Sequence, residues 1–308
     1  SQLSGIVTLI RSALKDEVLT LPEDFDWGSA VPLLYEHHLV GIAVRGAARC
    51  GIPRSHPAVR QLTALFCKDV ATSRLQMQQL EAVYTLFREH GIQYMPVKGA
   101  VLKPMYPQSE LRAMGDADIL IRLEQRPRIE AILENLGFQF KEETDHELVW
   151  QSKKLYLELH KHLIPSYNRE LYAYFGDGWS MAVPGGGSRW EMTPEDAFVY
   201  LFTHFAKHYR DGGVGVRQAL DLWVYRRSTP QLDTAYIDGE LQKLHLDRFH
   251  ENMVCLLEKW FEDGQGNETS EFLGEFIFKS GVWGDVQSHY LAQEAKVQKN
   301  SSSFAMGK

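Results

Sequence analysis

Met114-Gly115-Asp116-Ala117-Asp118-Ile119-Leu120-Ile121 is the stretch of sequence that decides the fold. The run is typical of a β-strand, in which successive side chains point to opposite faces. Asp116 and Asp118 are two residues apart, so both carboxylates lie on one face and the apolar residues after them point into a core. Adjacent carboxylates repel each other unless a cation lies between them. The pattern therefore predicts a divalent metal site, and Mg²⁺ is favoured because it prefers a few carboxylates with phosphate oxygens and water.

A second strand supplies a third carboxylate. In the segment 154–160, leucines alternate with Tyr156, Glu158 and His160. If the leucines face the core, Glu158 and His160 share the opposite face. Should this strand lie near the one that carries Asp118, Glu158 completes a cluster of three carboxylates that can hold one or two metal ions. Such a cluster can polarise an attacking hydroxyl while the metal stabilises a leaving pyrophosphate.

A strand-to-helix turn upstream carries groups suited to phosphate. Gly99 would let backbone amides approach phosphate oxygens next to a helix start, and Lys98 and Arg112 could add charge-assisted hydrogen bonds to a triphosphate. Each piece alone has an ordinary interpretation: a solvated strand end or calcium-loop fragment for Asp-x-Asp, an exposed strand residue for Glu158, a simple turn for Lys98-Gly99. Their combination, in this order, is what indicates chemistry.

The remaining patterns place this core between helical regions. The sequence predicts an α+β fold in which a small mixed β-sheet core is flanked by N-terminal and C-terminal helical regions. The expected parts are an N-terminal helical region (1–92), the α/β core (93–183), a linker (184–192), a C-terminal helical domain (193–297) and a mobile tail (298–308). The glycine run 184–188 lacks the Lys-Ser/Thr of a P-loop, so we expect a flexible connection there. Thr193 is expected to cap a helix, and one helix is expected over 241–261.

Composition narrows the classes of function. The chain has 308 residues, of which 44% are hydrophobic, and a formal net charge of -7, which disfavours nucleic-acid binding by bulk charge. Its three cysteines show no Cys-x-x-Cys spacing, so neither a disulfide framework nor a structural zinc finger is expected. The sequence contains no apolar run of membrane-spanning length and no signal-peptide pattern at its start. These features predict a protein of the reducing cytoplasm without a membrane partner.

At these residues the sequence resembles the nucleotidyltransferase superfamily, whose fold is shared by DNA polymerase β and antibiotic nucleotidyltransferases. It is most similar to the bacterial branch called uncharacterised nucleotidyltransferases (the NTP_transf_5 type). The likeness extends over about residues 30–285 and is strongest over 95–160. The matching motif consists of Val97-Lys98-Gly99, Tyr106, Arg112, Asp116-Ala117-Asp118-Ile119-Leu120, and Glu158 two residues before His160.

The resemblance implies that Asp116 and Asp118 bind Mg²⁺, with Mn²⁺ as an alternative ion. It implies Glu158 as the third carboxylate and a candidate general base, and a nucleoside triphosphate, by default ATP, as substrate. Lys98-Gly99 stands where the superfamily usually has a Gly-Ser pair, so the chain departs from the usual pattern at the phosphate-binding turn.

Candidates for an acceptor pocket are the histidines His160, His204 and His208. The last two are four residues apart and share a helix face, where lining a pocket is favoured over binding a metal. Lys207, Arg217 and Asp221 are expected to form structural salt bridges. The acidic charge favours a small-molecule or protein acceptor over RNA. Two alternatives stay open: a non-catalytic module that binds a nucleotide or a partner, and a toxin-like enzyme that modifies RNA.

Overall fold

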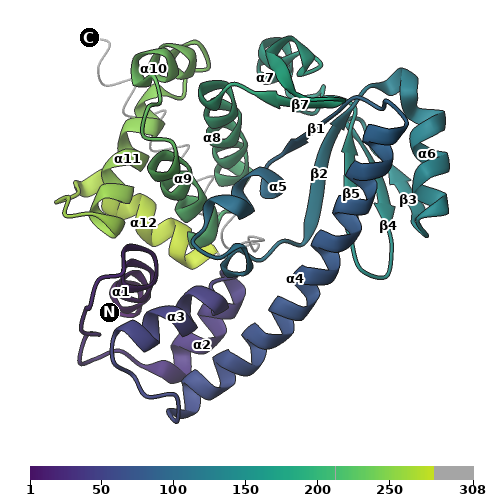
Figure 1. Cartoon of the computed structure of the whole chain (residues 1–308). Helices are drawn as coiled ribbons and strands as arrows, with labels where there is room; N and C mark the ends of the chain where they lie inside the picture. The colour runs from purple at the N-terminus through teal and green to yellow at the C-terminus, as the bar shows by residue number, and fades with distance from the viewer. Residues whose placement is uncertain (212, 281–308) are drawn as a thin grey trace, which may run out of the picture. The chain divides into compact units, whose positions relative to one another are not determined.

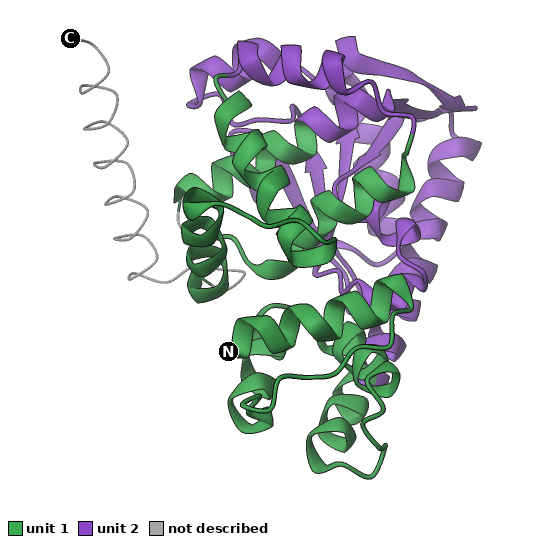
Figure 2. Cartoon of the chain, turned by 90° about the vertical axis from the view of Figure 1, so that its left-hand side faces the viewer, with its two compact units in different colours: residues 1–66, 200–230, 245–308 green, residues 67–199, 231–244 purple. Residues whose placement is uncertain are grey.

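The computed structural model describes residues 1–211 and 213–280 (Figure 1). Two compact units make up the chain, and each is assembled from segments that are far apart in the sequence (Figure 2). The described part of unit 1 comprises residues 1–66, 200–211, 213–230 and 245–280, and unit 2 comprises Cys67–Val199 and Gln231–Leu244. The domain boundaries expected from the sequence stay a prediction, and the expected tail 298–308 lies outside the described residues.

All regular elements in the described part of unit 1 are helices. Its elements are α1 (Gln2–Lys15), α2 (Trp27–Glu36), α3 (Val40–Arg49), the start of α4 (Pro57–Glu89), most of α8 (Pro194–Asp211), α9 (Val216–Ser228), α11 (Asp247–Phe261) and α12 (Glu268–Ser280). Helices α1 and α3 pack so closely that a Cβ atom on Gly46 would lie 2.1 Å from the carbonyl oxygen of Leu9. Only glycine allows that approach. Arg11 on α1 donates to the backbone oxygen of Glu262 at 2.9 Å, which ties α1 to the end of α11.

Unit 2 contains a mixed seven-stranded sheet with the strand order β3-β4-β5-β2-β1-β7-β6. Strands β2 and β5 are parallel, and β1 is antiparallel to β2. The strands are β1 (Tyr94–Val97), β2 (Asp116–Ile121), β3 (Gln139–Glu143), β4 (Glu147–Gln151), β5 (Tyr156–His160), β6 (Ala182–Gly186) and β7 (Arg189–Met192). The other elements are the remainder of α4, α5 (Gly99–Leu102), η1 (Lys103–Met105), η2 (Ser109–Leu111), η3 (Leu123–Gln125), α6 (Arg126–Asn135), α7 (Arg169–Phe175), η4 (Trp179–Met181), the start of α8 and α10 (Thr234–Lys243).

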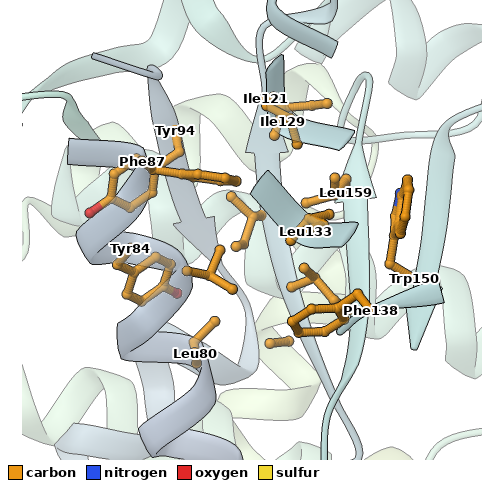
Figure 3. Packing of buried hydrophobic residues seen from close by; sticks show 14 of the residues in the cluster. Leu80, Tyr84, Phe87, Tyr94, Ile121, Ile129, Leu133, Phe138, Trp150 and Leu159 are labelled. Atoms are coloured by element: carbon orange, nitrogen blue, oxygen red, sulfur yellow. The ribbon is translucent and has the colours of Figure 1, made fainter. Parts of the chain in front are cut away.

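One face of this sheet is covered by α4 and α6 and forms a hydrophobic core (Figure 3). Ile119 of β2, Leu159 of β5 and Trp150 of β4 are buried in one cluster that also contains Leu133 of α6. The rings of Tyr84 on α4 and of Tyr94 on β1 stack with their centroids 5.0 Å apart. Because side chains alternate along each strand, this packing turns Asp116 and Asp118 of β2 to the opposite face, as their spacing predicts.

The structure confirms the predicted α+β fold with helices before and after a mixed sheet. Thr193 caps α8, since its Oγ1 accepts a hydrogen bond from the amide of Asp196 at 3.1 Å. Among the described residues, no helix is both long and apolar enough to cross a membrane.

Two local expectations were wrong. The glycine run 184–188 lies in a hairpin of β6 and β7 and is not a flexible linker. Gly187, with φ 59°, occupies the two-residue connection, where a left-handed residue matches the twist of the strands. The helix expected over 241–261 is two helices, α10 and α11, because the backbone turns at His245, whose φ is 56°.

Candidate active site

Parallel pairing of β2 and β5 brings the acidic residues of both strands together. In this register Asp118 lies opposite Glu158, and Leu120 lies opposite His160. Ligand atoms of Asp118, Glu158 and His160 lie within 4.8 Å of one another. Asp116 shares the face at the start of β2, where it is half-buried, but it is outside this tight group. The structure thus joins two of the three predicted carboxylates and adds an imidazole to them.

Asp118 is the centre of a charged network. Its Oδ1 accepts hydrogen bonds from Lys98 Nζ at 2.5 Å and from His160 Nε2 at 2.8 Å. Burial raises the pKa of this carboxyl, but the Lys98 ammonium and the His160 hydrogen bond outweigh burial and hold the pKa well below its usual range. Burial and the nearby Lys98 charge lower the pKa of His160. At neutral pH Asp118 is therefore ionised, and His160 is neutral.

The pKa of Glu158 shifts in the opposite direction to that of Asp118. Burial and the neighbouring charge of Asp118 raise the pKa of Glu158 to about 9. Its Oε2 lies 3.7 Å from His160 Nε2, too far for a hydrogen bond that would stabilise the charged form. In this state Glu158 therefore holds a proton at neutral pH. A divalent cation between the two carboxylates would replace that proton, so the residues fit a metal ion of this type.

Lys98 reaches Asp118 through a strained backbone. Strand β1 ends at Val97, which lies opposite Asp118, and α5 begins at Gly99. Between them Lys98 adopts φ 49° and ψ −118°, a backbone conformation that residues other than glycine rarely take. Such strain costs about 1–3 kcal/mol and concentrates at functional sites. The turn directs the ammonium group back onto β2.

Arg112 packs against the same turn. A Cβ atom on Gly99 would lie 3.0 Å from Arg112 Nη1, so the glycine lets the buried guanidinium approach the backbone. Lys103 is fully buried and donates to the carbonyl oxygens of Ser109 at 2.8 Å and Arg112 at 2.6 Å. Lys98 and Gly99 thus form the turn and Arg112 packs against it, so the three residues predicted as phosphate ligands lie close together. Sequence reasoning missed Lys103, which holds the segment that carries Arg112.

The three histidines predicted for an acceptor pocket have different surroundings. His160 is hydrogen-bonded to Asp118 in unit 2. His204 and His208 lie next to each other in the unit 1 part of α8, with their Nε2 atoms 3.0 Å apart. Their role in acceptor binding stays a prediction. Arg217 Nη1 lies 3.2 Å from Asp221 Oδ2, which confirms the structural ion pair expected for these residues.

A cavity of about 420 Å³ lies at the carboxyl ends of β2 and β5. The guanidinium of Arg122 stacks 4.0 Å from the ring centroid of Trp179 at this cavity, and Trp179 Nε1 donates to the backbone oxygen of Ile121 at 3.3 Å. Other lining residues are Lys161, His162, Tyr172 and Asp177. Sequence reasoning missed this cavity, although Arg122 continues the alternation that begins at Asp116 and Asp118.

A mixed sheet that pairs acidic residues on adjacent parallel strands, beside a Lys-Gly turn, has the features expected of a nucleotidyltransferase core. The chain belongs to the family described as uncharacterised nucleotidyltransferase (NTP_transf_5), whose model matches residues 23–262. This match confirms the resemblance seen in the sequence. No curated protein matches the chain.

Two solved structures are similar to the chain in part. The solution structure of the antibiotic-resistance factor ANT(2'')-Ia has a TM-score of 0.40 and 14% sequence identity, and covers 58% of this chain and 98% of that one. The crystal structure of ANT(2'')-Ia in complex with adenylyl-2''-tobramycin has a TM-score of 0.38 and 14% identity, and covers 57% of this chain and 99% of that one.

Proposed function

We propose that the protein is a Mg²⁺-dependent nucleotidyltransferase that moves a nucleoside monophosphate from a nucleoside triphosphate, by default ATP, to a hydroxyl-type acceptor. An oxygen of the acceptor forms a bond to the α-phosphorus, the bond from that phosphorus to the bridging oxygen breaks, and pyrophosphate leaves. The observation that supports this proposal most is the crowding of Asp118 and Glu158 on β2 and β5, with ligand atoms of the group within 4.8 Å.

Asp116, Asp118 and Glu158 would hold the ion, with Mn²⁺ as an alternative to Mg²⁺. When bound, the ion supplies charge stabilisation for the attacking and leaving oxygens. Asp118 is ready for this role because it is ionised. Glu158 becomes available as a ligand or as the base for the acceptor proton only once its own proton has left, because its pKa is raised to about 9.

Lys98 has two roles in this proposal, one without the metal ion and one with it. Without the ion, its ammonium neutralises Asp118 directly, at 2.5 Å. With the carboxylates neutralised by a divalent cation, the ammonium would be available to bind the phosphates, together with Arg112 and the backbone at Gly99. Helix α5 has four residues, so its dipole adds little, and side-chain charge carries most of the phosphate binding.

The acceptor is proposed from charge alone. A net charge of -7 works against a large RNA, whose phosphates require basic surface, and favours a small molecule or a protein.

Pyrophosphate release during incubation with each nucleoside triphosphate, Mg²⁺ and a panel of small-molecule and protein acceptors tests the proposal. Wild type and the exposed control Asp24→Asn should turn over equally, whereas Asp118→Asn should lose activity while it keeps its circular dichroism spectrum. Full activity in folded Asp118→Asn would disprove the proposal. Tight nucleotide binding without turnover on any acceptor would instead favour a non-catalytic binding module.

A further inference from the structure

A second group of ligands lies beside the carboxylate cluster. One ring nitrogen each of His146 and His160 and a carboxylate oxygen of Glu147 lie within 4.8 Å of one another. Glu147 and His160 are direct partners in the antiparallel pairing of β4 and β5, so their side chains share a face of the sheet. His146 precedes β4, and its Nε2 lies 3.3 Å from Glu147 Oε2. The side chains of all three residues are mostly buried.

The hydrogen bonds of His160 determine which of its nitrogens is free to bind an ion. Asp118 Oδ1 already accepts a hydrogen bond from Lys98 Nζ and also accepts in its 2.8 Å contact with His160, so the hydrogen in that contact belongs to Nε2. Nδ1 of the neutral ring then carries a lone pair. This atom has no hydrogen-bond partner within the described part of the chain, and the side chain is only 1% exposed, so water cannot easily replace one. A buried acceptor without a partner requires an explanation, and a role as a metal ligand is one.

His146 is oriented in a similar way. Its Nδ1 lies 3.4 Å from the hydroxyl oxygen of Thr144, which leaves Nε2 on the side of Glu147. A histidine that binds a metal through one nitrogen commonly hydrogen-bonds a carboxylate, carbonyl or hydroxyl through the other, which fixes the ring. His160 with Asp118 and His146 with Thr144 both follow this arrangement.

We propose that His146 Nε2, His160 Nδ1 and the Glu147 carboxylate bind a divalent transition-metal ion of the Zn²⁺ class. Two imidazoles and one carboxylate favour Zn²⁺ or Co²⁺ over Mg²⁺, which prefers oxygen ligands. Three protein ligands leave a further coordination position for water or another small ligand. This site is separate from the proposed Mg²⁺ site, although both share His160: Nε2 faces Asp118, and Nδ1 binds the new ion.

Binding of Co²⁺ to the metal-stripped full-length chain tests this proposal, in the absence of nucleotide and Mg²⁺. Co²⁺ in a site with nitrogen ligands shows visible absorption bands, so a titration gives both stoichiometry and affinity. The bands of wild type should correspond to one Co²⁺ per chain, counted apart from any Co²⁺ held by the Asp116, Asp118 and Glu158 carboxylates, and Zn²⁺ should abolish them. His146→Ala and Glu147→Gln should each abolish the stoichiometric bands. Glu147→Gln keeps the shape of the side chain, so it serves if His146→Ala fails to fold.

Two controls separate this site from its surroundings. His162→Ala removes a histidine whose ring centroid lies 6.2 Å from that of His146, and it should leave the bands and the affinity unchanged. Asp116→Asn should also bind Co²⁺ as wild type does, because Asp116 belongs only to the proposed Mg²⁺ site. Asp118→Ala removes the partner of His160 Nε2 and should weaken Co²⁺ binding about 10- to 100-fold.

No stoichiometric Co²⁺ or Zn²⁺ binding to wild type would overturn the proposal. So would bands that persist in both His146→Ala and Glu147→Gln, or bands that disappear in His162→Ala or in folded Asp116→Asn. Since no nucleotide is present, these outcomes do not depend on whether the protein is a nucleotidyltransferase.

Discussion

Asp118 and Glu158 lie opposite each other on the parallel strands β2 and β5, yet their pKa values shift in opposite directions. The difference arises because Lys98 and His160 donate hydrogen bonds to Asp118, whereas Glu158 is buried beside the resulting carboxylate. The pair therefore carries one negative charge at neutral pH and is prepared to accept a cation by losing a proton.

Metal binding should release that proton. Because the pKa of Glu158 is raised to about 9, a Mg²⁺ ion bound at pH 7 should displace about one proton from this carboxyl. Titration calorimetry in buffers of different ionisation enthalpy measures the number released. Glu158→Gln, which has no proton to lose, should show none, and above pH 9 the wild-type value should fall towards zero. Equal proton release from wild type and Glu158→Gln would contradict this assignment.

Glu158 should also shape the pH dependence of stability in the metal-free protein. Its pKa is about 9 when folded, against an ordinary 4.5, so unfolding releases a proton between these values. The stabilising contribution is complete below pH 4.5 and is lost as the pH rises through 9. Denaturant unfolding should show wild type losing stability relative to Glu158→Gln across this window. Parallel pH profiles for the two proteins would rule out the raised pKa.

Substitution of Lys98 separates its charge from its backbone strain. Lys98→Gly and Lys98→Met both remove the ammonium, but glycine accepts φ 49° without strain. Lys98→Gly should therefore be about 1 kcal/mol more stable than Lys98→Met. Both variants should bind Mg²⁺ more tightly than wild type in the absence of nucleotide, because the competing cation is gone, and both should lose transferase activity. Weaker Mg²⁺ binding in both would show that Lys98 does not compete for Asp118.

Gly99 should matter for nucleotide binding more than for stability. In Gly99→Ala the new methyl group would lie 3.0 Å from Arg112 Nη1 and would displace the guanidinium by a few tenths of an ångström. Since Arg112 is proposed to contact phosphate, we expect nucleotide affinity to fall about tenfold, a loss of about 1.4 kcal/mol. Gly239→Ala is the matched control, because a Cβ added there would meet no heavy atom within 4 Å outside its chain neighbours and its own helix turn. This variant should bind nucleotide as wild type does. Equal nucleotide affinities of Gly99→Ala and Gly239→Ala, measured by calorimetry, would show that Arg112 does not contact the nucleotide.

The sequence predicted correctly the features that depend on the periodicity of a single strand. The alternation at Asp116 and Asp118 placed both carboxylates on one face of β2, with Ile119 in the core, because strand periodicity is local. The pairing of Glu158 with Asp118 was conditional on the neighbouring position of β5. That position depends on contacts between segments about forty residues apart, which no local pattern specifies.

Other features depended on tertiary context. The glycine run 184–188 is compatible with both a flexible linker and a tight hairpin, and pairing with β7 selects the hairpin. His146 and Glu147 gave no signal as a metal site because they come together with His160 only through the register of β4 on β5. The strained turn at Lys98 was also hidden, since the sequence there predicts only a strand followed by a helix.

Titration calorimetry of each nucleoside triphosphate, with and without Mg²⁺, tests the central claim most directly. Wild type should bind at least one nucleotide only when Mg²⁺ is present, and the Asp116→Ala/Asp118→Ala double variant should lose that binding while remaining folded. Nucleotide binding that is independent of Mg²⁺, or that survives unchanged in the double variant, would contradict the assignment of β2 as the metal-binding strand.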